Sequence, residues 1–199
     1  MSNAKAYIIS ALVLGIFSWY YLVVRAQPAS LNFINAIVAF SAVIIIGFSF
    51  VLGPLSNFIK FFAKYESYRK TFGLIGYALA GLHIVLVVPL LLQEAGEGTV
   101  AMIVSVAVAA VAFMIFTLMA LTSTGKWMAT LGYENWKSLQ RTGYIAIVLV
   151  MFHVALLDSG AFIFQRITGQ IAIGFILLIL LLRGLAQVFS HSERKIKVE

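Results

Sequence analysis

The chain has 199 residues, of which 62% are hydrophobic and only 11% are charged. Soluble domains carry about 25% charged residues, so this composition excludes a soluble globular domain and indicates an integral membrane protein. The absence of cysteine excludes disulfides, Cys-ligated iron–sulfur clusters, covalent c-type haem attachment and thiol catalysis. No Gly-rich phosphate-binding pattern follows a strand pattern, so no flavin or nicotinamide domain is expected within the chain.

Six apolar segments are long enough to cross a bilayer. The sequence therefore predicts an all-α polytopic membrane protein, with one domain over residues 1–199 that forms a six-helix transmembrane bundle. Pro54 is expected to close the second segment. The first segment has no Ala-x-Ala cleavage pattern before Arg25, so we interpret it as a mature span. The predicted spans cover residues of about 6–24, 31–53, 72–93, 99–122, 142–158 and 162–188.

The net charge of +7 orients the bundle. Six spans place both termini on one side, and of the 14 lysines and arginines only Arg25 and Arg166 fall on the other side. The positive-inside rule then predicts cytoplasmic N- and C-termini, and the expected location is the bacterial inner membrane. Because the basic residues are dispersed at span ends, no nucleic-acid binding is expected. The remaining basic residues are Lys5, Lys60, Lys64, Arg69, Lys70, Lys126, Lys137, Arg141, Arg183, Arg194, Lys195 and Lys197.

The loop between the second and third spans, PLSNFIKFFAKYESYRKTFG, is rich in aromatic residues. Lys60 and Lys64 fall on another face of the same predicted helix. This pattern predicts an amphipathic helix that lies on the inner membrane surface. Its apolar face would consist of Phe58, Phe61, Phe62 and Tyr65.

Two histidines lie deep inside apolar spans, His83 in YALAGLHIVLVV and His153 in IAIVLVMFHVALL. A polar ring in a bilayer core is costly, so each is a candidate functional residue. Each follows the basic start of its span by about three turns, which predicts a similar depth. Two imidazoles at one level on two helices favour a bis-histidine metal or haem site, although each ring can instead bond a neighbouring carbonyl or a water. Gly76, Ala80 and Gly81 are expected to leave space for a flat macrocycle.

The other candidate residues have simpler interpretations. His191 lies in the polar segment HSERKIKVE and is predicted to be a solvated surface residue. Arg25 and Arg166 are the outer-side cations, and they serve either as interfacial anchors or as partners of haem propionates. Trp127, Tyr133 and Trp136 are typical of the aromatic belt at a membrane interface, with an aromatic relay or a quinone site as the alternative role.

Two stretches carry a family resemblance. The stretch YRKTFGLIGYALAGLHIVL resembles the third span of the ferric reductase-like transmembrane domain family, in which an Arg-rich entry and a Leu-Gly pair precede a haem-ligating histidine. The stretch ALTSTGKWMATLGYENWKSLQRTGYIAIVLVMFHVALL resembles the following region of that family. The shared features there are the Leu-Thr-Ser exit of the fourth span, the Trp136-Lys137 pair and the mid-span His153. The resemblance covers roughly residues 68–157.

The resemblance implies one b-type haem with His83 and His153 as its axial ligands. The family's Leu-His-Arg tripeptide is Leu-Gln-Arg at residues 139–141, and Arg69 lies fourteen residues before His83, where two-haem members place a second histidine. The resemblance therefore does not imply an inner haem. In size the chain is similar to the stand-alone haem subunits, including the one that feeds electrons to a periplasmic methionine sulfoxide reductase.

Two classes of function remain. The first is a membrane b-type haem electron-transfer protein, an oxidoreductase component that takes electrons from a quinol or a separate flavoprotein. Its electrons would leave to a periplasmic redox partner, a metal complex or another oxidant. The second is a haem-free transporter or membrane assembly factor. Span interiors without Asp, Glu, Lys or Arg, apart from Arg183 at a cytoplasmic end, argue against a transporter.

Overall fold

The computed structural model describes residues 3–93, 99–157 and 166–196. Every regular element in these residues is a helix, which confirms the predicted all-α fold, and six stretches are long and apolar enough to cross a membrane. The predicted span end at 158 and span start at 162 lie outside the described residues. The six stretches are Ala4–Val24, Leu31–Phe58, Lys60–Leu92, Val100–Leu121, Tyr133–Leu156 and Ile167–Phe189.

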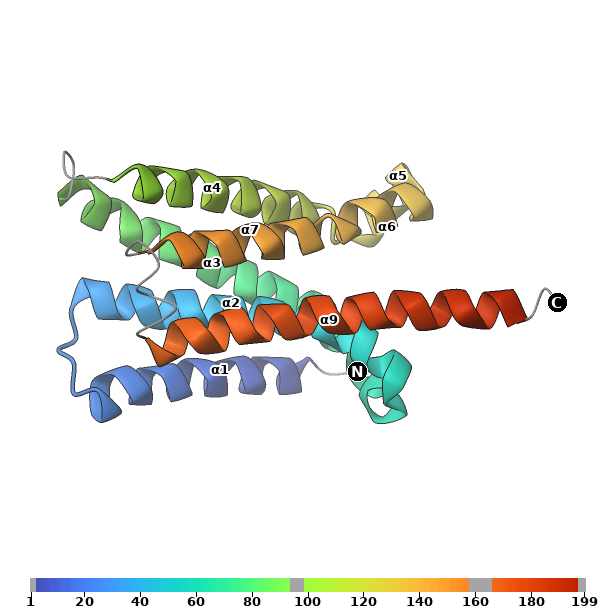
Figure 1. The fold of residues 1–199 in the computed structure, drawn as a ribbon, viewed down its shortest axis with the longest axis horizontal. Coiled ribbons are helices and arrows are strands. Elements are labelled where there is room, and N and C mark those ends of the chain that lie inside the picture. The colour runs from blue at the N-terminus through green and yellow to red at the C-terminus, as the bar shows by residue number, and fades with distance from the viewer. Residues whose placement is uncertain (1–2, 94–98, 158–165, 197–199) are drawn as a thin grey trace.

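The helices lie side by side in one elongated bundle (Figure 1). The first helix begins and the last helix ends toward the same end of the bundle, which is also the end that carries the short helices α5 and α6 (Figure 1). Helices suit a lipid environment because they satisfy their own backbone hydrogen bonds. The elements are α1 (Ala4–Trp19), a π-helical turn η1 (Tyr20–Val24), α2 (Leu31–Phe58), a 3₁₀-helix η2 (Lys60–Tyr68), α3 (Arg69–Gln93), α4 (Val100–Leu121), α5 (Gly125–Leu131), α6 (Tyr133–Arg141), α7 (Gly143–Leu156) and α9 (Ile167–Ile196).

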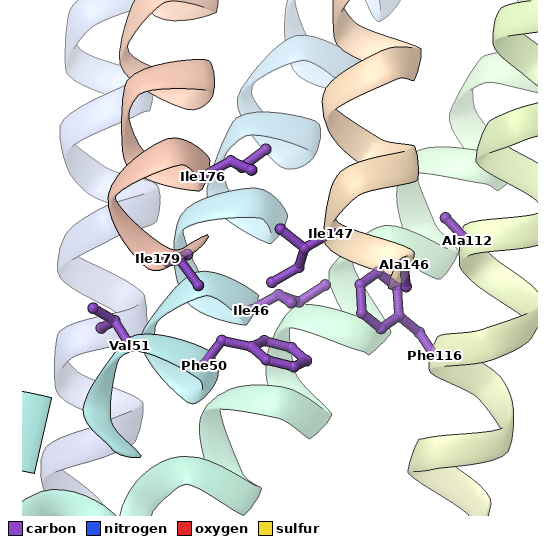
Figure 2. Packing of buried hydrophobic residues seen from close by; sticks show 9 residues of the cluster. All are labelled: Ile46, Phe50, Val51, Ala112, Phe116, Ala146, Ile147, Ile176 and Ile179. Carbon is purple, nitrogen blue, oxygen red and sulfur yellow. The ribbon is translucent and has the colours of Figure 1, made fainter. Parts of the chain in front are cut away.

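The central helix of the bundle is α2. Of its most apolar stretch 61% is buried, against 17% for α1 and for α4, and it packs against α1, α3 and α9. Side chains from four helices meet in the main apolar cluster (Figure 2). Since lipid tails are as apolar as leucine, close packing rather than water exclusion holds such a cluster together. Its members are Ile46, Phe50 and Val51 of α2, Ala112 and Phe116 of α4, Ala146 and Ile147 of α7, and Ile176 and Ile179 of α9.

A glycine allows α2 and α3 to approach closely. A Cβ atom on Gly76 would lie 2.8 Å from the backbone nitrogen of Ile46. The expectation that Gly76 leaves space for a macrocycle is therefore wrong, because α2 occupies that space. A Cβ atom on Gly81 would meet only the ring of Phe113, at an ordinary 3.8 Å.

The expectation that Pro54 closes the second span is also wrong. The helix α2 continues through Pro54 to Phe58. Proline removes one backbone donor, but a helix in a packed bundle tolerates this when neighbouring groups compensate. Near Pro54 the guanidinium of Arg69 lies against Gly53, and its Nε–H donates to the carbonyl of Ser49 at 2.8 Å, one residue before the Phe50 carbonyl that Pro54 leaves without its usual helical donor.

The loop predicted to be an amphipathic helix forms the 3₁₀-helix η2. Three residues per turn align Phe62, Tyr65 and Tyr68 along one side, with ring centres 6.3 Å and 6.0 Å apart. Tyr68 is buried, whereas Phe61 is exposed with the ammonium of Lys64 3.8 Å from its ring centre. The predicted apolar face is therefore wrong in part, because Phe58 ends α2 and Phe61 is exposed beside Lys64 instead of sharing the side of Phe62 and Tyr65. The location of this segment on the inner membrane surface stays a prediction.

Candidate functional site

The structure brings the two intramembrane histidines together. His83 lies on α3 and His153 lies on α7, and their ring centres are 6.4 Å apart with an angle of 62° between the ring planes. Both rings are partly buried in the bundle. Two polar rings in contact inside an apolar bundle define the candidate site.

His83 is held from α2. Its Nδ1 atom lies 2.7 Å from Oδ1 of Asn35. Asn35 stands in the first turns of α2, and its side chain is only 8% exposed. A buried amide in an apolar helix needs a partner, and His83 supplies it.

His153 is held by α4, a helix that Thr99 caps by accepting the N–H of Met102 at 3.2 Å. The Nδ1 atom of His153 lies 2.8 Å from Oγ of Ser105 and 3.1 Å from the carbonyl oxygen of Ser105. The hydroxyl of Ser105 also donates to the carbonyl of His153 at 3.1 Å. Ser105 is therefore fully engaged, and it is 1% exposed.

Asn35 and Ser105 were not predicted as site residues from the sequence. One signal was present: each is a polar residue inside an apolar span, and each stands 48 residues before the histidine that it contacts. Polar residues of these types commonly bond their own helix backbone, so the sequence alone does not reveal their partners.

The pair of imidazoles fits a haem. Two imidazoles on opposite sides of one metal, each about 2 Å from it, have ring centres about 6 Å apart, and the observed value is 6.4 Å. Both Nδ1 atoms are occupied by hydrogen bonds, so Nε2 is the nitrogen left for a metal. In the described part of the chain no three His, Cys, Asp or Glu side chains gather. A haem needs only two protein ligands, because its macrocycle supplies four nitrogens to the iron. The assignment of His83 and His153 as ligands stays a prediction.

Both outer arginines have exposed side chains, Arg25 directly after η1 and Arg166 directly before α9. The hydroxyl of Tyr21 lies 3.3 Å from that of Thr168, which ties the two segments together. Their role as propionate partners stays a prediction. The side chain of His191 lies outside the described part of the chain, so its surface position also stays a prediction.

A cavity of about 330 Å³ opens near the other end of α3. Arg69 and Gln140, the two residues at which the family resemblance implied no inner haem, both line it. The amide of Gln140 donates to the carbonyl of Met119 and to Oγ1 of Thr122, both at 3.3 Å. The cavity is lined by Ile46, Ser49, Phe50, Glu66, Ser67, Arg69, Lys70, Gly73, Leu74, Tyr77, Phe116, Met119, Ala120, Ser123, Trp136 and Gln140.

Trp136 has a more specific place than the interfacial belt that the sequence suggested. Its indole Nε1–H donates to the carbonyl of Thr122 at 2.9 Å, and its side chain lines the cavity. The hydrogen bond joins α6 to the end of α4, so Trp136 forms part of the cavity wall.

The fold and the paired imidazoles define a polytopic membrane protein with a candidate redox centre in its interior. The family model of the ferric reductase like transmembrane component matches residues 34–151, which is 118 of the 199 residues, and the chain belongs to this family. Family membership implies a function in electron transfer within a membrane. The matched segment includes Asn35, His83 and Ser105, and it ends two residues before His153. A comparison with curated proteins gave no match.

Proposed function

We propose that this protein is a membrane electron-transfer subunit that binds one b-type haem between His83 and His153. The observation that carries the proposal is the 6.4 Å separation of the two ring centres, with both Nδ1 atoms already engaged. A bis-imidazole haem supplies a one-electron carrier without an open axial position, which suits electron transfer better than oxygen chemistry.

The residues of the chain supply binding, orientation and a dry surrounding. His83 and His153 each offer one ring nitrogen, and the α2 and α4 helices hold the opposite edge of each ring. Apolar side chains of the bundle keep water away from the rings, which stabilises a buried redox centre of fixed geometry. We assign Arg25 and Arg166 to the propionates of the same haem, because both cations lie on the outer side of the bundle and a guanidinium binds a carboxylate well.

The distribution of basic residues sets the proposed direction of electron flow across the membrane. With cytoplasmic termini in a bacterial inner membrane, the cavity of Arg69 and Gln140 faces the cytoplasmic half, and the histidine pair lies deeper along the same helix. The proposed donor is a quinol or a separate flavoprotein, and the proposed acceptor is a periplasmic redox partner, a metal complex or another oxidant. The aromatic walls and amide of the cavity suit the ring and oxygens of a quinol.

The test is a haem count on the purified protein. A pyridine-haemochrome assay is expected to give about one haem per chain, with a reducible low-spin b-type spectrum. Two haems per chain would contradict the single site. No haem after expression in a haem-replete host would favour the haem-free transporter or assembly factor instead. Reduction of the purified protein by a quinol analogue, compared with reduction by a flavoprotein reductase, then separates the two donors.

A further inference from the structure

Asn35 and Ser105 are the two buried polar side chains that contact the candidate ligands. We infer that they are positioning residues: they fix His83 and His153 with the proton on Nδ1, so that each bare Nε2 is available to the metal. The inference rests on the proposed haem site, and it assigns a role to two residues that do not touch the iron.

Ser105 settles the tautomer of His153. The carbonyl oxygen of Ser105 lies 3.1 Å from Nδ1 of His153, and a carbonyl can only accept, so Nδ1 must carry the proton. The hydroxyl of Ser105 donates its own proton to the carbonyl of His153 at 3.1 Å. Its lone pairs are then free to accept from Nδ1 at 2.8 Å. Both acceptors of Ser105 therefore point to the same protonation state of the ring.

Asn35 acts on His83 in the same sense. Its Oδ1 accepts the Nδ1–H of His83 at 2.7 Å. The opposite amide orientation would present an N–H₂ group to Nδ1, which would move the ring proton to Nε2 and block the bond to a metal. Among the described residues Asn35 has one side-chain hydrogen-bond partner, His83.

The two histidines depend on these residues to different degrees. Removing the Ser105 side chain leaves the Ser105 carbonyl in place, so His153 keeps one acceptor. Removing the Asn35 amide leaves His83 without an acceptor, and its proton is free to shift to Nε2. An acceptor on Nδ1–H also makes the imidazole a more basic ligand, which stabilises the ferric state and lowers the midpoint potential.

The experiment compares three variants of the full-length protein in detergent. For Asn35→Leu, which keeps the branched shape but removes both polar atoms, haem transfer to excess apomyoglobin is expected to show about 10- to 100-fold weaker haem retention. Asn35→Asp keeps an oxygen acceptor of greater negative charge, so it is expected to retain haem and to lower the midpoint potential in a redox titration. Ser105→Ala is expected to show a smaller loss of retention than Asn35→Leu. The matched control is Ser41→Ala, which removes a buried hydroxyl of α2 that has no hydrogen-bond partner, and which should leave both readouts unchanged.

The outcomes separate this inference from the proposed function. Wild-type haem retention and an unchanged potential in Asn35→Leu, with haem lost in His83→Ala, would overturn the inference and leave the function intact. If Asn35→Leu does not fold, the potential of Asn35→Asp decides, and an unchanged potential overturns the inference. A wild-type protein that holds no haem would overturn both.

Discussion

The helix α3 presents two levels with different chemistry. At the level of His83 it faces His153 across 6.4 Å between ring centres, and the rings are held by hydrogen bonds from neighbouring helices. At the level of Arg69 it faces Gln140 across a cavity of about 330 Å³. The same scaffold thus carries a closed, pre-oriented pair of imidazoles at one level and an open cavity, lined by both apolar and polar side chains, at the other.

The pair of imidazoles is held in place by its supporting residues as well as by the helices that carry it. The histidine level has a buried acceptor for each ring. At the other level the polar side chains are already engaged elsewhere, because Arg69 donates to Ser49 and Gln140 donates to Met119 and Thr122. The difference between the levels is therefore one of the whole hydrogen-bond arrangement, and single substitutions test it in different ways.

The largest effect is expected at the closed level. His83→Ala or His153→Ala should abolish stable haem binding, because one axial bond is lost and a cavity opens beside the ring. Absorption spectra of the purified variants are the measurement, with His191→Ala in the polar C-terminal segment as the control that keeps its haem. A full low-spin bis-histidine spectrum in either span variant would show that the ligands are wrongly assigned.

The next largest effect is expected at Gly76, where α2 and α3 approach closely between the two levels of α3. Gly76→Ala should destabilise the fold by about 1–3 kcal/mol, because the new methyl group meets the backbone of Ile46. Gly81→Ala on the same helix is the matched control, since its methyl group meets only the ring of Phe113 at 3.8 Å. Thermal unfolding followed by circular dichroism is expected to show a lower Tm for the first variant alone. Equal melting of the two variants would contradict the close approach of α2 and α3.

A smaller effect is expected at the open level. If a quinol docks in the cavity, Gln140→Leu removes one neutral hydrogen bond of about 1 kcal/mol, which corresponds to roughly fivefold slower reduction by a quinol analogue. The haem content should stay at the wild-type value. Stopped-flow reduction is the measurement, and an unchanged rate would exclude Gln140 from the donor site.

The smallest effect is expected for Gln140→His, which tests most directly how the Arg69 level differs from the His83 level. Gln140→His should leave the haem count unchanged, because a six-coordinate site needs two opposed ligands and Arg69 occupies the matching level of α3. Pyridine-haemochrome analysis measures the count. A second haem in this single variant would reveal an inner pocket with another ligand already in place. The double variant Arg69→His with Gln140→His asks whether two histidines alone suffice there.

The histidine pair was predictable because a polar ring interrupts an apolar span, and hydropathy registers such an interruption directly. The supporting residues were not, because which helices are neighbours is a property of packing, and Asn35 and Ser105 are too common in membrane helices to point at a partner. The cavity escaped prediction for a related reason: its walls come from α2, η2, α3, α4 and α6, and it exists only once these elements have packed.

The corrections have a similar origin. Pro54 is a helix breaker by local rules, yet α2 continues through it to Phe58 within the packed bundle. Gly76 was expected to leave space for a macrocycle, but α2 occupies that space, because the sequence does not say which element packs against a glycine. In both cases the residue type indicated a special position in the helix, and the tertiary contacts determined which structure forms there.

The equal spacing of the two supporting contacts bears on how the protein is assembled. Asn35 and His83 belong to the pair α2 and α3, whereas Ser105 and His153 belong to the pair α4 and α7, and each contact spans 48 residues. Each half of the site is therefore complete within one helix pair. The N-terminal pair leaves the ribosome first and can orient its imidazole before the second pair enters the membrane. Lateral docking of the two halves would then bring the two imidazoles together, so that their contact forms only after α2, α3, α4 and α7 have all entered the membrane.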